Sequence, residues 1–236
     1  MIDIHSHILP AIDDGAKTPE ESLRILEMMK EQGISDVIAT PHFLPGKENL
    51  GGFLERVVAS KNELFKIGLP EDLPKIHFGC EIYYFPGMGE VESLKSLTLA
   101  DSKYLLIDFT FAEFDDYVIK DIINLDDNFG IIPVIAHIER YYYFKGFKKL
   151  LKCLDSGIGI AQINADSVLN SEYLRRVKKL IKKGYISIVA TDSHSVENRP
   201  PKLEEAYIRL RKICGDKYID RLISSQENLK KQILGE

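Results

Sequence analysis

Five of the six histidines in this 236-residue chain lie in segments that each follow an apolar run able to form a buried strand. Two further runs of this kind end in the acids Glu81 and Asp108. In a barrel of parallel strands, the C-terminal strand ends and their loops meet at one mouth. The sequence therefore predicts a cluster of imidazoles and carboxylates that can bind more than one metal ion. The histidine segments are His5-Ser6-His7, Thr40-Pro41-His42, Ala136-His137-Ile138-Glu139-Arg140 and Thr191-Asp192-Ser193-His194.

The joint pattern is stronger evidence than any one of its parts. His5 and His7 can bind one ion, because alternate strand residues face the same side, but such a pair also occurs as polar core residues. A buried charge at the end of an apolar run needs a partner, because an unpaired one is costly. Shared cations would provide that partner for the residues at such ends, namely Glu81, Asp108, His137, Asp192 and His194. By contrast, His77 lies at the beginning of its run and is expected to stay outside the site.

Three further residues lie beside these segments. The loop Asp13-Asp14-Gly15 can be a turn with a helix-capping acid, or it can supply a ligand for a third ion, for which we favour Asp14 over Asp13. Arg140 follows His137 by three residues, and Arg199 follows His194 by five. A planar guanidinium suits phosphate oxygens, although a salt bridge to a nearby acid is the alternative. We favour phosphate, because the chain is otherwise acidic.

The composition narrows the class of protein. A formal net charge of −5 argues against binding nucleic acid through general phosphate attraction. No apolar run is long enough to span a membrane, and the first residues resemble a strand and not a signal peptide, so we expect a cytoplasmic protein. The three cysteines have no metal-binding spacing, and none begins a Cys-x5-Arg phosphatase loop.

The order of elements predicts an α/β fold. Apolar runs typical of strands covered on both faces alternate with helical segments. One helix is expected after the capping box at Thr18, with Pro19 at its first position and Gly33 past its end; another is expected over 171–183. We predict a single domain over 1–236, a seven-stranded TIM-like barrel closed by C-terminal helices, with an open doubly wound sheet as the alternative. The predicted strands are 2–4, 36–39, 76–79, 104–109, 131–136, 159–163 and 186–190.

These segments resemble one known superfamily. Within the PHP (polymerase and histidinol phosphatase) superfamily, they are most similar to the manganese-dependent bacterial protein-tyrosine phosphatases of capsule and exopolysaccharide loci. The match runs in order from the first residues to Pro201. The segments that carry it are residues 4–10, 13–15, 40–42, 79–84, 136–141, 162–165 and 191–194, together with Arg199-Pro200-Pro201.

The resemblance implies a distorted (β/α)7 barrel with a site for three metal ions. His5, His7, Glu81 and Asp192 would hold the first, Glu81, Asp108 and His137 the second, and Asp14, His42 and His194 the third. Arg140 and Arg199 would bind the phosphate. Two positions depart from the family. Asp108 stands where glutamate is usual, which can shift the second metal or place a water beside it. Phe43 stands where a second histidine is common, which affects only the rim.

The implied activity is hydrolysis of phosphotyrosine. Two or three divalent transition ions, most often Mn and otherwise Fe or Zn, would lower the pKa of a water so that hydroxide attacks phosphorus in line. Asp192 or His194 could serve as the general acid. The implied partner is a tyrosine-phosphorylated protein such as a bacterial tyrosine autokinase. The alternative is a small-molecule phosphatase, for example one for histidinol phosphate. An amidohydrolase would need a bridging lysine, and Lys95 and Lys103 are misplaced for it. The non-enzymatic alternative is a degenerate metal-binding module attached to a partner kinase. Such a module would have lost ligands, whereas the ligand set in this sequence is complete.

Half of the eleven phenylalanines and eleven tyrosines lie within seven residues after a proposed ligand. Each can simply pack a loop onto the rim, but together they can form an apolar wall for a flat substrate ring. They are Phe43, Tyr83, Tyr84, Phe85, Phe109, Phe111, Phe114, Tyr141, Tyr142, Tyr143 and Phe144.

Overall fold

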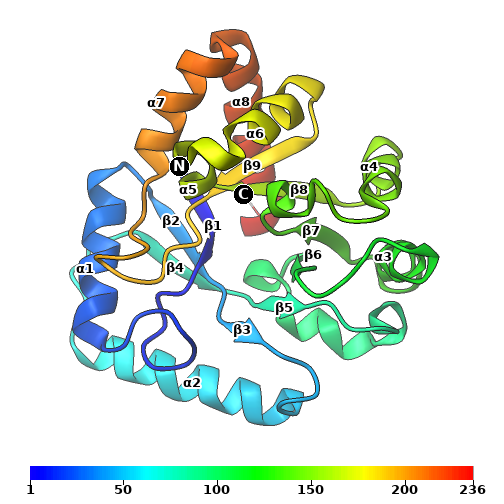
Figure 1. Cartoon of the computed structure of the whole chain (residues 1–236). Helices are drawn as coiled ribbons and strands as arrows, with labels where there is room; N and C mark the ends of the chain where they lie inside the picture. Colours follow the sequence, from blue (N-terminus) through cyan, green and yellow to red (C-terminus); the bar gives the residue numbers. More distant parts are fainter. Residues whose placement is uncertain (236) are drawn as a thin grey trace.

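The computed structural model describes residues 1–235, which form parallel β-sheets surrounded by helices (Figure 1). The predicted α/β class is therefore confirmed. Every strand pair is parallel, and the strands are largely buried. The strands are β1 (Ile2–Ser6), β2 (Asp36–Ala39), β3 (His42–Phe43), β4 (Lys75–Phe78), β5 (Glu81–Tyr83), β6 (Tyr104–Asp108), β7 (Ile132–Ile135), β8 (Ile160–Asn164) and β9 (Ile186–Ala190).

The strands are divided between two hydrogen-bonded sheets. One has the order β1-β2-β4, and the other has the order β3-β5-β6-β7-β8-β9. The seven predicted strands all occur, but two of them are followed after a short break by β3 and β5, which join the second sheet. On the other side, β1 meets the segment after β9 through a bridge between Ser6 and Ser193. The pairing within residues 1–235 therefore does not form the closed barrel that we predicted.

The helices begin and end where local signals indicate. The side chain of Thr18 caps α1 by accepting a hydrogen bond from the Glu21 amide at 3.2 Å, and Gly184 ends α6 in the left-handed conformation. The cap at Thr18 and the bounds 171–183 of α6 were both predicted. The helices are α1 (Pro19–Glu31), α2 (Leu50–Lys66), α3 (Asp116–Phe129), α4 (Phe147–Asp155), α5 (Ala165–Leu169), α6 (Ser171–Lys183), α7 (Leu203–Cys214) and α8 (Asp216–Leu234), with 3-10 helices η1 (Met88–Glu90), η2 (Glu92–Leu97), η3 (Leu99–Asp101) and η4 (Ile138–Tyr141).

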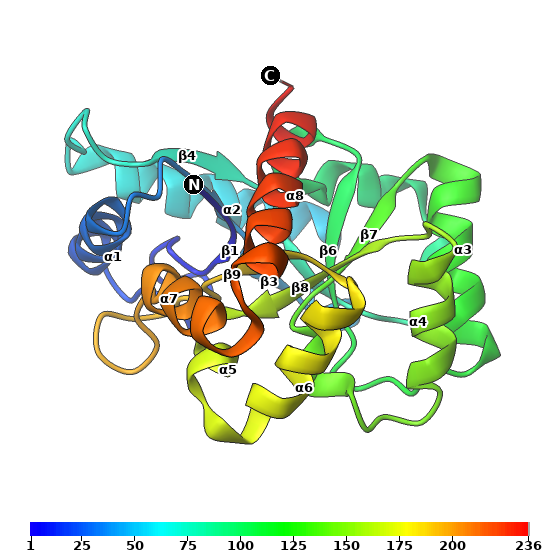
Figure 2. The ribbon, with the colours of Figure 1, turned by 90° about the horizontal axis from the view of Figure 1, so that it is seen from above.

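The C-terminal helix α8 lies beside β9 and β1 (Figure 2). Its residues Leu229 and Ile233 pack into a small apolar cluster formed by side chains from several strands, among them Ile4, Leu106 and Ile188. Gln226 donates a hydrogen bond to the carbonyl of Ile2 at 3.0 Å. Ile2 begins β1, whereas His5 and His7 lie at its other end, one inside the strand and one just beyond it, so α8 covers the end opposite to these histidines. None of the helices in the described residues has the length and apolar character needed to cross a bilayer.

Candidate metal centre

The predicted ligands come together at the C-terminal ends of the strands. Three groups of side chains each place their ligand atoms within 4.8 Å of one another. Glu81 belongs to two of the groups, and His7 also belongs to two, so the three groups form one continuous cluster. Asp192 lies beside it, with its Oδ1 3.4 Å from His5 Nε2. The groups are His5, His7 and Glu81; Glu81, Asp108 and His137; and His7, Asp14, His42 and His194.

Glu81 connects the first two groups through its two oxygens. Its Oε2 lies 3.2 Å from His5 Nε2 and 3.4 Å from His7 Nε2. Its Oε1 lies 3.0 Å from His137 Nε2, which is also 3.6 Å from Asp108 Oδ2. A carboxylate oriented in this way can bridge two cations.

The third group has a more exposed member. Asp14 Oδ1 lies 3.4 Å from His42 Nε2 and 3.4 Å from His194 Nε2. Asp14 is 64% exposed in its side chain, whereas Glu81 and Asp192 are almost fully buried. The third group therefore faces the mouth, and the first two lie deeper.

Hydrogen bonds to Nδ1 orient four of the histidines. In each case, an oxygen lies at Nδ1 while Nε2 points into the cluster. A proton on Nδ1 satisfies this contact and leaves the Nε2 lone pair for a metal ion, as in metal sites generally. The pairs are His5 with Gln162 Oε1 at 3.3 Å, His7 with Asp13 Oδ2 at 2.8 Å, His137 with the Tyr141 hydroxyl at 2.8 Å, and His194 with the Asp192 carbonyl at 2.9 Å.

Unsatisfied buried atoms test whether the cluster fits metal ions. Among residues 1–235, His42 Nδ1, Glu81 Oε2 and His194 Nε2 are buried without a hydrogen-bond partner. His42 Nδ1 lies 2.9 Å from Glu81 Oε2, but the contact lacks the geometry of a hydrogen bond. Three unpartnered ligand atoms in one cluster are costly without a cation. Imidazole and carboxylate donors suit Mn, Fe or Zn, so the residues fit divalent transition ions.

The pKa values of two buried carboxylates in the cluster, Glu81 and Asp192, are lowered, so both are ionised. Burial opposes ionisation of Glu81, but His5, His137 and His42 lower its pKa well below the usual value. Burial likewise opposes ionisation of Asp192, and its neighbours, His5 first among them, lower its pKa strongly. Burial, with His7 beside it, lowers the pKa of His194 to about 3, so this imidazole is neutral and its lone pair is available.

The backbone is strained at two ligand positions. His137 has φ of 33° and Asp192 has φ of 52°, in the left-handed region that residues other than glycine seldom adopt. Each lies two residues past the end of a strand, β7 for His137 and β9 for Asp192, where the chain turns and the side chain joins the cluster. Gly15 allows the first loop to fold back, because a Cβ there would lie 2.1 Å from the His7 carbonyl oxygen.

The two arginines meet at one carboxylate. Arg199 Nη2 lies 2.7 Å from Asp192 Oδ2, and Arg140 Nη2 lies 3.1 Å from the same oxygen. This is the salt bridge that we considered as the alternative to phosphate binding. Both side chains are more than a third exposed, and they stand beside the cluster. Their contact with phosphate remains a prediction.

The aromatic residues divide into core and rim. Phe43, Phe109, Phe114 and Tyr141 are buried, so they pack the loops. Tyr83 lies beside the cluster, with its ring centroid 5.2 Å from that of His42, and it stacks on Phe111 at 5.5 Å. Phe111 is 83% exposed. The Tyr83–Phe111 stack is therefore the part of the predicted wall that a substrate can reach beside the cluster.

Sequence reasoning missed the residues that support the ligands. We chose Asp14 over Asp13 as a ligand, but Asp13 also serves the site by orienting His7. Gln162 contacts His5 and the His137 amide, and Asn164 donates to Asp192 Oδ2 at 2.5 Å. Both lie in the segment 162–165 that carries the family resemblance, and both are polar residues within a buried strand, but sequence reasoning gave neither a role. His77 lies apart from the cluster, where its Nε2 is 3.1 Å from Asp36 Oδ1.

Comparison with solved structures supports the fold and the kind of site. A crystal structure described as YwqE from Bacillus subtilis and CpsB from Streptococcus pneumoniae, "unique metal-dependent tyrosine phosphatases", matches with a TM-score of 0.80 and 31% identity. The match covers 98% of this chain and 95% of the other. A β-aspartyl dipeptidase from Fervidobacterium islandicum matches with a TM-score of 0.58 and 12% identity, which indicates a similar fold alone.

Curated relatives match over nearly the whole chain. Tyrosine-protein phosphatase CpsB of Streptococcus agalactiae is 33% identical, covering 92% of this chain and 90% of the relative. Tyrosine-protein phosphatase YwqE of Bacillus subtilis is 34% identical, covering 97% and 91%. Residues 1–233 match the sequence family described as "Capsular polysaccharide synthesis, CpsB/CapC". The chain belongs to the CpsB/CapC family of capsular polysaccharide synthesis.

Proposed function

We propose that this protein is a metal-dependent protein-tyrosine phosphatase that uses the ligand cluster as its active site. The observation that carries the proposal is the sharing of Glu81 and His7 between neighbouring ligand groups, with two arginines beside them. A site for several divalent ions next to guanidinium groups suits the hydrolysis of a phosphate monoester. The names of the relatives support the same activity.

The proposal includes the finer form of the fold and the metal content. We infer that residues 1–236 form one domain, and that the two sheets are parts of one distorted (β/α)7 barrel. The Ser6–Ser193 bridge, which brings β1 against the segment after β9, supports this inference. We expect two or three ions, with manganese preferred over iron or zinc.

The protein's own groups would bind and orient the phosphate. When bound, the ions would supply a water of lowered pKa and positive charge facing the phosphate. Arg140 and Arg199 would donate to the equatorial oxygens, exchanging part of their contact with Asp192. Asp192 and His194 are our candidates for the general acid; because Asp192 is ionised and His194 is neutral, either would first have to take up the proton that the attacking water loses and then deliver it to the leaving oxygen. A phenol has a pKa near 10, so its oxygen needs less help than an alkoxide would.

The substrate would be a tyrosine phosphate on a protein. The Tyr83–Phe111 stack beside His42 offers an apolar face for the substrate ring. We infer that the substrate is a bacterial tyrosine autokinase of a capsule or exopolysaccharide locus, and that the enzyme acts in the cytoplasm. Membership of a capsule synthesis family supports this choice.

A comparison of substrates tests the function. Phosphotyrosine peptides should be hydrolysed with a much higher kcat/KM than phosphoserine peptides or histidinol phosphate, because the phenol leaves more easily and its ring can be buried. Aryl and alkyl phosphates of similar size separate the two causes, since leaving-group ability alone would make a small aryl phosphate as good as the peptide. If histidinol phosphate is the best substrate, the small-molecule alternative is correct.

A further inference from the structure

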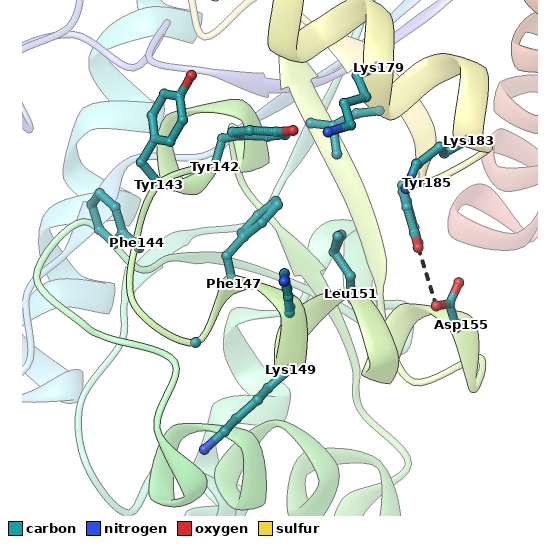
Figure 3. A pocket seen from close by; sticks show the side chains of 13 residues that line it. Tyr142, Tyr143, Phe144, Phe147, Lys149, Leu151, Asp155, Lys179, Lys183 and Tyr185 are labelled. Carbon is teal, nitrogen blue, oxygen red and sulfur yellow. Dashed lines mark hydrogen bonds between the residues drawn. The ribbon is translucent and has the colours of Figure 1, made fainter.

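A groove of about 780 Å³ lies between α4 and α6 (Figure 3). None of the proposed metal ligands lines it. Its aromatic residues are Tyr142, Tyr143, Phe144, Phe147 and Tyr185, and four lysines surround them. The groove is therefore both apolar and basic, a combination that the activity at the metal centre does not explain.

The charge in the groove is opposite to that of the whole chain. The chain has a formal net charge of −5, yet the lining contains Lys148, Lys149, Lys179 and Lys183 against the single carboxylate of Asp155. Asp155 accepts a hydrogen bond from the Tyr185 hydroxyl at 3.2 Å (Figure 3). These lysines therefore form a local positive patch on an acidic protein.

Most of these lysines are available to a ligand. Lys149 is paired with Asp116 at 2.6 Å. Lys148 and Lys183 form no ion pair with any residue among 1–235, and Lys179 lies 5.4 Å from the centroid of the Tyr142 ring. Ammonium groups beside aromatic faces suit a ligand that carries negative charge together with apolar surface.

The polypeptide chain connects the groove to the active site through η4. This short helix carries Arg140, which lies at the metal centre, and the chain continues directly to Tyr142 and Tyr143 in the groove. Tyr143 is 73% exposed, and the guanidinium of Arg176 on α6 lies 4.7 Å from its ring centroid. A polypeptide that leaves the metal centre past Arg140 would therefore meet this surface.

We propose that the α4–α6 groove binds an acidic segment of the protein substrate, next to the phosphotyrosine that enters the metal centre. The inference rests on the proposed function and adds a determinant of substrate choice. Charge complementarity and continuity with η4 favour a peptide occupant. Aspartate and glutamate side chains would lie at Lys148, Lys179 and Lys183, and an apolar residue of the segment would pack on Tyr142 and the exposed Tyr143.

The helix α6 offers a matched pair of variants. Lys179→Glu with Lys183→Glu reverses two charges in the groove. Lys178→Glu with Lys182→Glu makes the same charge change on the same helix outside the lining. Each variant is assayed with p-nitrophenyl phosphate and with two phosphotyrosine peptides, one flanked by aspartate and glutamate and the other by asparagine and glutamine. Hydrolysis of p-nitrophenyl phosphate at the wild-type rate shows that each variant is folded.

The wild type should prefer the acidic peptide through a lower KM. The groove variant should lose about tenfold in kcat/KM for that peptide, as expected for two exposed charge contacts. Its kcat and its activity on the neutral peptide should stay near wild type, and the control variant should keep the preference. Equal use of both peptides by the wild type, or equal losses in the two variants, would overturn the proposal.

Two further binding experiments cover the cases in which the peptides are not hydrolysed or in which the basic patch binds a membrane. If the wild type hydrolyses neither peptide, the proposed function fails. Fluorescence anisotropy with the unphosphorylated acidic peptide then tests separately whether the groove binds an acidic segment. Binding that the groove variant loses and the control variant keeps would support the groove, and absence of binding would overturn it. Phosphatidylglycerol vesicles that bind the wild type but not the groove variant, without any preference between peptides, would assign the patch to a membrane surface and overturn the peptide proposal.

Discussion

Replacement of Tyr141 by phenylalanine would test how the second ligand group is held. The hydroxyl of this fully buried residue lies 2.8 Å from His137 Nδ1, 2.9 Å from Asp108 Oδ1 and 3.0 Å from the Phe109 amide nitrogen. Burial and the nearby Asp108 raise its pKa, so the phenol keeps its single proton. Donation to Asp108 and acceptance from His137 and Phe109 satisfy all three contacts. This arrangement places the His137 proton on Nδ1 and leaves Nε2 for metal.

Phenylalanine lacks the hydroxyl group and cannot make these three hydrogen bonds, which sets the expected loss of stability and of metal affinity. The Phe109 amide would lose its partner, and an unsatisfied buried donor costs about 1–3 kcal/mol of unfolding free energy. His137 and Asp108 would lose their orientation, and removal of such an outer hydrogen bond lowers metal affinity about 10–100-fold. Competition with a chelating dye measures the affinity for Mn or Zn, and urea unfolding with a chelator present measures the stability of the metal-free protein.

Tyr84→Phe is the matched control. The Tyr84 hydroxyl donates to Asp121 at 2.8 Å, and its ring stacks on Phe109 at 5.3 Å. Its contact with the ligand Asp108 is a backbone hydrogen bond from the Tyr84 amide to the Asp108 carbonyl at 2.8 Å, which phenylalanine would keep. This variant should lose stability and keep wild-type metal affinity. If Tyr141→Phe also keeps wild-type metal affinity and loses only stability, Tyr141 does not orient the site and the reasoning is wrong.

Three further predictions concern the arginines, the metals and a distant carboxylate. Arg140→Ala or Arg199→Ala should lower phosphotyrosine hydrolysis about 10–1000-fold with metal content unchanged; wild-type kinetics in both would make them structural. Elemental analysis should find two to three transition ions per chain, and EDTA should abolish activity until Mn is added; full activity after exhaustive chelation would contradict the metal mechanism. Burial opposes ionisation of Asp36, but hydrogen bonds from Lys230, His77 and Ser35 hold its pKa at about 2, below 3.8. Asp36→Asn should therefore cost about 1–2 kcal/mol in urea unfolding at pH 7, and less as the pH falls from about 4 to 2; a cost independent of pH would contradict this.

The sequence predicted the elements that have strong local signals. Continuous apolar runs predicted seven strands, and the capping box at Thr18 predicted the start of α1. The short strands β3 and β5 were missed, because two or three residues carry no periodicity. They follow Pro41 and Gly79, where the chain changes from one sheet to the other. How strands pair across such breaks depends on tertiary packing. The sequence pattern therefore could not decide whether the strands pair into one closed barrel or into two sheets.

The ligand cluster was more predictable than its supports. Each proposed ligand ends or follows an apolar run, and parallel strands direct those ends to one place. The choice between Asp13 and Asp14 depends on loop conformation, and Gln162 reads in the sequence as an ordinary polar residue in a strand. The left-handed conformation of His137 and Asp192 also leaves no trace in residue type. The orientation of the ligand side chains could therefore be found only from the structure.

The position of β1 has a consequence for the order of folding. Beside β2, its neighbours are the segment after β9 and helix α8, so the first histidine pair is held by residues synthesised almost last. Contacts that join distant parts of a chain close large loops and form slowly. Ribosome-bound chains that lack β9 should therefore be unable to complete the first and third ligand groups, and metal binding at those groups would report that the segment after β9 has docked.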